Sequence, residues 1–496
     1  MGDVLFTYYV FLFLFRPEIN SDKLNICSEG FANFSYKIAR TCYPILINKI
    51  VHLHKPLAID IMKYDAINSN LFIENRKRFA ASLKPNSIAL FVSNDILPTN
   101  ADGAFGFVQN SDLFYLSGVD QEETILLIYP DAITGSHKEI LFVRETSEHI
   151  AIWEGAKLTK EQATKASGIK NVQWIHHFEQ IIKGIIYQPE RIYLNSNEHN
   201  RRYIDMQTAE MRFNKKIQEQ YPLHAIERAA PLMHKLRSVK SDVEIDLIQK
   251  ACDITEKGFR RLLGFIKPGV TEYEIEAELI HEFIRNRSNG FAYPPIIASG
   301  HNACVLHYLE NNKECKDGDV ILLDVAAEYA NYRSDLTRCL PVNGKFTKRQ
   351  KDVYNAVLRV MKAATNMLTV GNTFPEYNKA VGQLMEKELV DLGLITMDDI
   401  KKQNPELPAY KKYFMHGTSH FLGLDVHDVG DFGSKMQAGN VFTCEPGIYI
   451  PAENLGIRIE NNILITPKGP VDLMKNIPVE VEELEALMAN NSVFAK

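Results

Sequence analysis

The 496-residue sequence holds only seven cysteines, an odd number, and it has no CxxC pair. A disulfide framework or a cysteine-rich zinc site is therefore not expected, and we interpret the cysteines as reduced thiols. Positive charge is not in excess either, because 56 lysines and arginines stand against 62 acidic residues. Since nucleic-acid binding requires a basic face for the phosphates, the sequence predicts no nucleic-acid partner.

Apolar runs long enough to span a bilayer are also missing. The run at residues 5–15 is 11 residues long, whereas a spanning helix needs about 17–25, so we expect no membrane association. The run resembles the core of a signal peptide, but no lysine or arginine precedes it. We expect residues 1–61 to be an accessory N-terminal extension or a misassigned start. The predicted location is cytoplasmic, or exported if the run is a genuine signal segment.

Residues 62–235 show a mixed α/β pattern without a glycine-rich loop of the kind that cradles phosphate. Short apolar runs rich in β-branched residues predict strands, and periodic amphipathic segments predict helices between them. We interpret this part as a smaller N-terminal domain with a supporting or specificity role. The predicted strands are 87–93, 123–130, 138–144 and 191–195, and the predicted helices are 158–167 and 201–221.

The order of elements in residues 236–496 occurs twice. Each unit begins with a helix that a capping box starts, Ser241 with Glu244 in the first and Thr347 with Gln350 in the second. A second helix, strands and a hairpin with two acidic residues follow in each unit. This repeat of elements predicts a pseudo-twofold domain with a site between its halves.

The two acidic pairs each flank a polar turn. Asp324 and Asp335 lie on either side of EYAN, and Glu445 and Glu460 lie on either side of PAEN. Antiparallel hairpins centred on these turns bring the acids of each pair nearly opposite each other. Because like charges in that position repel, the four carboxylates predict a cation between them.

A histidine-rich segment, FMHGTSHFLGLDVHDVG, supplies His416, His420 and His427, and His307 in CVLHYLENN is a fourth candidate. Four carboxylates and one imidazole form a ligand set for two divalent ions, whose charge balances the acids. Oxygen-rich ligation of this kind suits Mn²⁺, with Co²⁺, Fe²⁺ or Zn²⁺ as alternatives. A two-metal site is typical of hydrolysis.

Each of these residues alone also has an ordinary structural explanation. Asp324 fits the end of a strand, Glu460 fits a surface ion pair with Arg458, and a single histidine such as His420 fits a satisfied position in the core. Their occurrence together in one domain is what favours the metal site.

The second half resembles the pita-bread metallopeptidases, most closely the Xaa-Pro aminopeptidases (aminopeptidase P). The resemblance covers roughly residues 68–490, including QNSDLFYLSG and AIWEG in the first half. It implies an α+β protein with a C-terminal pita-bread (creatinase/aminopeptidase) domain at 236–496. The segments that carry it are LRSVKSDVEI, SGHNACVLHYLEN, GDVILLDVAAEYANYRSDLTRCLPVNGKFT, FMHGTSHFLGLDVHDVG, EPGIYI and GIRIE.

The resemblance also implies a role for each ligand. Asp324 would bind one metal ion, Asp335 and Glu460 would bridge both ions, and His420 and Glu445 would complete the shell of the other. The family often has two acidic residues after the last glutamate, where this chain has two asparagines at 461–462. Neither is a ligand position, so we expect activity to be retained.

Further residues match catalytic positions of the family. His307 and His427 match histidines that contact the substrate and steady the scissile carbonyl, and His416 matches a position in the substrate pocket. Arg458 matches an arginine that pairs with the acids of the site. Glu445 is expected to pass a proton to the leaving nitrogen as well as to bind metal.

The implied reaction is release of the N-terminal residue from peptides with proline in the second position, by attack of a hydroxide that bridges the two ions. The nearest alternative is prolidase, an Xaa-Pro dipeptidase with the same ligands. A methionine aminopeptidase would not need the N-terminal domain, and a catalytically inactive peptide-binding module would have lost ligands. The family further implies a homo-oligomer, a dimer or tetramer, in which the tryptophan at the position of Trp153 approaches a neighbour's active site.

Overall fold

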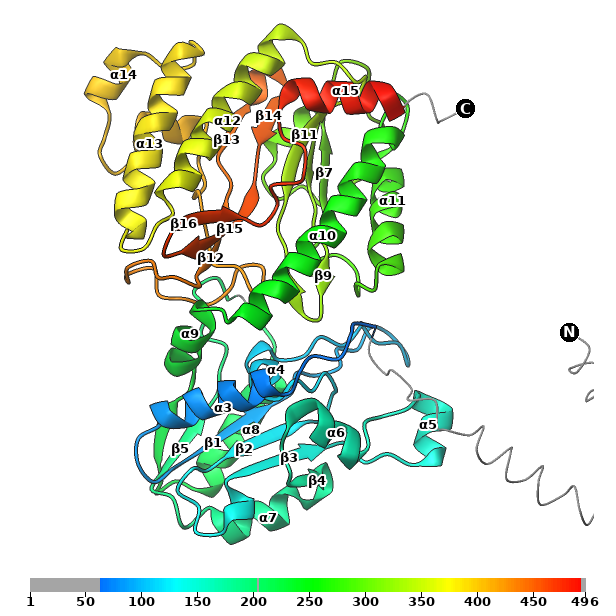
Figure 1. Ribbon diagram of the computed structural model, residues 1–496, viewed down its shortest axis with the longest axis vertical. Helices are drawn as coiled ribbons and strands as arrows, with labels where there is room; N and C mark the ends of the chain where they lie inside the picture. Colours follow the sequence, from blue (N-terminus) through cyan, green and yellow to red (C-terminus); the bar gives the residue numbers. More distant parts are fainter. Residues whose placement is uncertain (1–62, 203–204, 492–496) are drawn as a thin grey trace, which may run out of the picture. The chain divides into compact units, whose positions relative to one another are not determined.

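The computed structural model describes residues 63–202 and 205–491 (Figure 1). The chain divides into two units, Met1–Asp60 and Ile61–Lys496, and the described residues belong to the second. The predicted extension at 1–61 lies outside the described residues. The five cysteines within them are free thiols. None of the helices in the described part is both long and apolar enough to cross a membrane.

A six-stranded sheet forms the centre of the first described half (Figure 1). Its strand order is β4-β3-β2-β1-β5-β6; β2 pairs antiparallel with β1 and β3, and the other neighbours pair in parallel. The four predicted strands are confirmed. The bounds are β1 Ser87–Val92, β2 Ile125–Ile128, β3 Glu139–Val143, β4 Val172–Trp174, β5 Arg191–Leu194 and β6 Ala225–Arg228.

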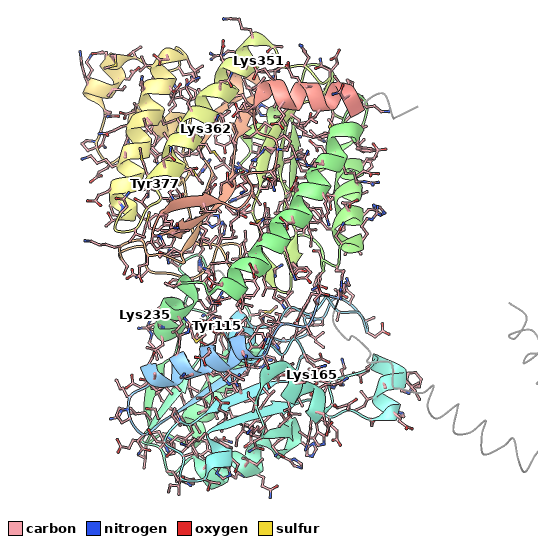
Figure 2. All side chains as sticks on the ribbon, in the orientation of Figure 1. Tyr115, Lys165, Lys235, Lys351, Lys362 and Tyr377 are labelled. Carbon is pink, nitrogen blue, oxygen red and sulfur yellow. The ribbon has the colours of Figure 1, made fainter. Side chains whose placement is uncertain are left out.

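Both faces of the central strands β1, β2 and β3 are buried, which explains why these strands read as continuous apolar runs. Ile88 and Leu90 of β1 pack in one cluster with the helices α7 and α8, whereas Ala89 and Phe91 pack in another with α3 and α4. Tyr115 on α4 (Figure 2) also donates its hydroxyl hydrogen to the carbonyl of Leu236 over 3.3 Å. The helices of this half are α3 Asn70–Ser82, α4 Ser111–Ser117, α5 Glu148–Glu154, α6 Lys160–Ser167, α7 Phe178–Ile185, α8 Ala209–Gln220 and α9 Ala230–Ser238.

One predicted helix begins later than expected. The helix placed at 201–221 is α8, which starts at Ala209 because the carboxylate of Asp95 accepts the N–H of Ala209 over 2.7 Å and caps the helix there. The predicted helix at 158–167 is confirmed as α6. The boundary predicted between residues 235 and 236 falls within α9 and stays a prediction.

In the second half the predicted order of elements is confirmed, and the strands lie between α10–α11 and α12–α13 (Figure 1). The capping boxes at Ser241 and Thr347 start α10 and α12 as predicted. A short helix, α14, was not expected in the polar insert, although Thr396 and Asp399 form a capping box there. The helices are α10 Asp242–Phe265, α11 Glu272–Arg285, α12 Lys348–Met367, α13 Phe374–Asp391, α14 Met397–Lys402 and α15 Val481–Asn491.

The strands of this half form several small sheets. β8 lies between β7 and β11, β15 lies between β12 and β16, and β9–β10 and β13–β14 are two-stranded hairpins. The bounds are β7 Ile296–Ser299, β8 Val320–Asp324, β9 Glu328–Tyr329, β10 Tyr332–Arg333, β11 Thr337–Pro341, β12 Val441–Cys444, β13 Gly447–Ile450, β14 Leu455–Arg458, β15 Asn461–Thr466 and β16 Gly469–Asp472.

The hairpin at EYAN is centred one residue later than its sequence predicts. Ala330 and Asn331 form the turn with φ values of 53° and 67°, the left-handed pair that a two-residue type I′ turn requires. Asp324 therefore lies opposite Thr337, and Asp335 is offset from it by two positions. This offset keeps both carboxylates on the same face of the hairpin.

In the second hairpin, Gly447 pairs with Arg458. Continuing that antiparallel register by two residues places Glu445 opposite Glu460, as predicted. An isolated bridge between Thr337 and Glu460 then joins the two hairpins.

Candidate metal centre

Five predicted ligands lie where the central strands of the second half end. Asp324 closes β8, Asp335 precedes β11, Glu445 follows β12, and Glu460 stands between β14 and β15. His420 lies in the loop before β12 and is tied to it, because the N–H of Thr443 donates to the His420 carbonyl over 3.0 Å.

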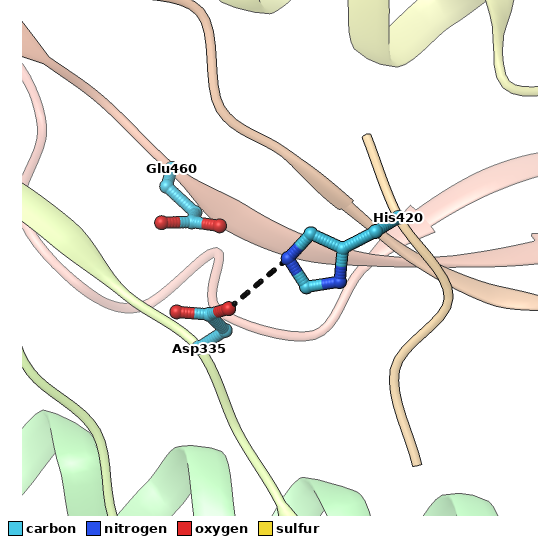
Figure 3. A group of neighbouring side chains, drawn as sticks. All are labelled: Asp335, His420 and Glu460. Atoms are coloured by element: carbon cyan, nitrogen blue, oxygen red, sulfur yellow. Dashed lines mark ion pairs between the residues drawn. The ribbon is translucent and has the colours of Figure 1, made fainter. Parts of the chain in front are cut away.

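Three of these residues form a compact buried cluster (Figure 3). One donor atom each from Asp335, His420 and Glu460 lies within 4.8 Å of the others. Nε2 of His420 is 3.4 Å from Oδ2 of Asp335. Nδ1 of His420 lies 2.9 Å from the carbonyl of Phe421, so a proton on Nδ1 leaves the Nε2 lone pair free for a metal ion.

Glu445 adjoins this cluster. Its Oε1 lies 3.6 Å from Nε2 of His420 and 3.4 Å from the hydroxyl of Thr443, which donates to it. Burial raises the pKa of Glu445 to about 7. The neighbouring His420 opposes this rise in the pKa, and the neighbouring Asp335 adds to it. The pKa of Glu460 is likewise raised well above its ordinary value, first by burial and then by the neighbouring carboxylates. Crowded buried acids of this kind favour either protonation or a cation between them.

Asp324 faces two donors rather than the three-residue cluster. Tyr293 donates its hydroxyl hydrogen to Oδ1 over 2.6 Å, and Arg458 donates to Oδ2 over 2.6 Å. Burial raises the pKa of Asp324, Arg458 opposes that rise, and Asp335 adds to it.

Arg458 is buried and contacts several site residues at once. Besides Asp324 it donates to the hydroxyl of Tyr449 over 2.7 Å and to the hydroxyl of Thr337 over 3.1 Å. Thr337 in turn donates to Glu460 over 2.7 Å. The surface ion pair between Arg458 and Glu460 that the sequence also allowed is therefore replaced by a buried pair with Asp324.

The predicted histidines line the same region. Nε2 of His416 is 2.8 Å from the hydroxyl of Tyr449, and the rings of His427 and His420 are 4.3 Å apart. Burial lowers the pKa of His416 and of His427 to about 3, with Arg458 contributing at His416 and His420 at His427. His307 is exposed, and its charge contributes to both lowered pKa values. His416 and His427 are therefore neutral at physiological pH.

Sequence reasoning missed three residues that hydrogen-bond to the proposed ligands or to Arg458: Tyr293, Thr337 and Tyr449. Thr337 could have been found from the hairpin register, since it lies opposite Asp324. Tyr449 could have been found from the strand period, which places it on the face of Glu445. Tyr293 lies outside the named strands, and its sequence context gives no such signal.

The donor set fits divalent metal ions. Carboxylate oxygens outnumber the single imidazole, and burial, followed by the neighbouring carboxylates, raises the pKa of Glu460. Hydrogen bonds from Thr337 and Tyr293 orient the carboxylates of Glu460 and Asp324, as is usual for metal-binding carboxylates.

Comparisons with known proteins agree with this geometry. The models of metallopeptidase family M24 and of the aminopeptidase P N-terminal domain match residues 246–467 and 72–193. The chain is 34% identical to the Xaa-Pro aminopeptidase of Haemophilus influenzae, covering 84% of this chain and 96% of the relative. It is 32% identical to the Xaa-Pro aminopeptidase of Escherichia coli K12, and the match covers 85% of this chain and 98% of the relative.

Solved structures are similar over the same range. Zn-substituted aminopeptidase P of Escherichia coli in complex with product matches with a TM-score of 0.77 at 31% identity, covering 86% of this chain and 99% of that one. Aminopeptidase PepP of Pseudomonas aeruginosa matches with the same TM-score of 0.77 at 31% identity. This match covers 86% of this chain and 99% of that one.

Proposed function

The chain belongs to the aminopeptidase P branch of metallopeptidase family M24, and from this premise we propose that it releases the N-terminal residue from peptides with proline in the second position. It is a metal-dependent aminopeptidase that acts on peptides and uses divalent metal ions. The prolidase and the inactive-module alternatives are not favoured, because the relatives are Xaa-Pro aminopeptidases. The observation that carries the proposal is the buried cluster of Asp335, His420 and Glu460 in a chain of this family.

We propose that these three residues, with Glu445 and Asp324, hold two divalent ions, with Mn²⁺ as the expected metal. When bound, the ions activate a water nucleophile and polarise the scissile carbonyl. Asp335 and Glu460, which share the buried cluster with His420, would hold the ions together with Asp324 and Glu445.

The protein residues position the substrate and move protons. Glu445, whose Oε1 lies 3.6 Å from Nε2 of His420, is proposed to take up the proton of the attacking water and to return it to the leaving prolyl nitrogen. His427 and His307 are proposed to donate hydrogen bonds to the carbonyl oxygen as negative charge develops on it. His416 lies 2.8 Å from the hydroxyl of Tyr449, which also accepts a hydrogen bond from Arg458, and is proposed to line the substrate site there.

The test is an assay with added Mn²⁺ on three peptides: Xaa-Pro, Xaa-Pro-Yaa-Zaa and Xaa-Ala-Yaa-Zaa. We expect release of the first residue from the proline tetrapeptide, and little hydrolysis of the alanine tetrapeptide. Cleavage confined to the dipeptide would instead identify a prolidase. A dimeric or tetrameric state and a cytoplasmic location stay predictions, and sedimentation of the purified protein tests the first.

A further inference from the structure

Arg201 lies beside the candidate metal centre without forming part of it. Its guanidinium contacts Nε2 of His427 over 2.8 Å, and the ring of His427 packs 4.3 Å from that of His420. Because arginine can only donate, Nε2 of His427 is the acceptor of this hydrogen bond. A permanent positive charge therefore stands one histidine ring away from the metal-binding cluster.

This charge is not balanced by an acid of the described residues, none of which forms an ion pair with Arg201 or Arg202. Both arginines and His427 line a pocket of about 620 Å³. The acids that line the same pocket have other partners: Asp95 pairs with Arg212, Asp112 and Asp425 pair with Arg237, Glu198 pairs with Arg228, and Glu210 accepts from the N–H of Asn197.

The pocket also has an apolar part. Leu97 and Val108 line it and are 43% and 54% exposed. Arg202 donates to the carbonyl of Asn197 over 2.7 Å, whereas Arg201 has no ion-pair partner among the described residues. An arginine of this kind beside exposed apolar side chains matches the chemistry of a peptide end, which combines a carboxylate with a side chain.

We propose that Arg201, with Arg202 beside it, binds the C-terminal carboxylate of a short substrate and so favours tripeptides of the form Xaa-Pro-Zaa with an apolar Zaa; this proposal rests on the proposed function. An extended residue spans about 3.3–3.6 Å. The carboxylate of such a tripeptide therefore lies roughly 7 Å beyond the scissile carbon. This distance matches the position of the Arg201 guanidinium, which the ring of His427 separates from the proposed ligand His420. The carboxylate of a dipeptide would fall short of it.

The experiment compares Xaa-Pro-Leu as the free acid with the same peptide as its C-terminal amide, at saturating Mn²⁺. We expect kcat/KM for the acid to exceed that for the amide by about 10-fold or more, as for a charge-assisted hydrogen bond. The Arg201→Gln variant is expected to reduce this acid-to-amide ratio to about twofold, through a higher KM for the acid. Arg201→Lys is expected to retain part of the preference, because it keeps the charge but not the planar fork.

Arg285→Gln is the matched control, since Arg285 is an exposed arginine of α11 whose nearest carboxylate, that of Glu282, is 3.8 Å away. It is expected to keep the wild-type ratio, and melting temperatures of all variants check that they fold. Two results would overturn the proposal: a wild-type protein that does not distinguish acid from amide, or an Arg201→Gln variant that loses activity equally on both. The proposed function would fail differently, by absence of hydrolysis of either peptide.

Discussion

Arg458 and Asp324, 134 positions apart in the sequence, form an ion pair over 2.6 Å beside the candidate metal centre. The same guanidinium donates to the hydroxyl of Thr337, and Thr337 donates to Glu460. One buried cation thus fixes a carboxylate from each hairpin. The positions of the two proposed ligands therefore depend on each other through Arg458 and Thr337.

Replacement of Thr337 with valine is expected to weaken metal binding. Valine keeps the shape of the side chain but leaves Glu460 without its donor and Arg458 without one acceptor. Loss of such a hydrogen bond to a ligand typically costs about 10–100-fold in metal affinity, which titration calorimetry with Mn²⁺ measures. Thr466→Val is the control, because Thr466 donates to the carbonyl of Gly469 at a turn between β15 and β16. Equal Mn²⁺ affinity in the two variants would contradict the proposed role of Thr337.

Replacement of His420 with alanine is expected to abolish hydrolysis and to lower the metal content. The imidazole is the only nitrogen donor of the buried cluster, and the acids Asp335 and Glu460 remain crowded without it. Elemental analysis of the purified variant measures the metal per chain alongside the peptidase assay. His137→Ala is the control, since His137 lies in the short 3₁₀ turn before β3. Near-wild-type hydrolysis by the His420 variant after dialysis against a chelator would contradict the metal mechanism.

Local patterns predicted much of this fold, because they concern residues close together in the sequence. The capping boxes at Ser241 and Thr347 start helices where expected. The polar centre at EYAN located a hairpin, but its register differs by one residue because Ala330 and Asn331 take the left-handed conformation. That shift changes which residue lies opposite Asp324.

The side chains that surround the ligands could not be predicted in the same way. Tyr293 reaches Asp324 across 31 positions, and Arg201 reaches His427 across 226. Such contacts depend on how distant segments pack, and neither a helical nor a strand period records that. The proposed ligands could be singled out from the sequence because carboxylates crowded on two hairpins are costly unless a cation accompanies them.

Glu445 and Glu460 are expected to destabilise the metal-free protein as pH rises from about 4.5 to above 7, whereas His416 and His427, whose pKa values are lowered from 6.5 to about 3, act in the opposite direction below 6.5. An acid whose pKa is higher in the folded state than in the unfolded state binds more protons when folded, so the free energy of unfolding decreases as pH increases through that window. Glu445, with a pKa of about 7 against an ordinary value of 4.5, contributes in this direction, and so does Glu460. Thermal melts in a chelating buffer at pH 5.5 and pH 8 measure the net effect of these groups.

Glu445→Gln separates this contribution from other titrating groups. Glutamine mimics the protonated acid, so the variant is expected to match the wild type at pH 5.5 and to be more stable than it at pH 8 when no metal is present. Added Mn²⁺ is expected to stabilise the wild type more at pH 8 than at pH 5.5, because the ligands must lose their protons to bind. A difference between variant and wild type that is the same at both pH values would show that Glu445 does not titrate in this window.

A buried ion-pair network supports the loop that carries His427. Arg237, which is 4% exposed, donates to Asp112 over 2.8 Å, to Asp425 over 2.7 Å and to Asp428 over 2.5 Å. Lys240 donates to the other oxygen of Asp428 over 3.0 Å. Removal of one partner from such a network leaves buried charges unpaired.

Arg237→Met is therefore expected to reduce the free energy of unfolding by about 3–5 kcal/mol, measured by urea denaturation of the metal-free protein. Lys402→Met breaks a surface pair with Asp398, whose side chains are 75% and 67% exposed, and is expected to cost about 1 kcal/mol or less. Addition of Asp428→Asn to Arg237→Met removes one of the unpaired charges, so the double variant is expected to recover part of the lost stability. If the effects of the two substitutions on the free energy of unfolding instead add independently, the carboxylate of Asp428 does not depend on Arg237. The loop that carries His427 is then held by other contacts.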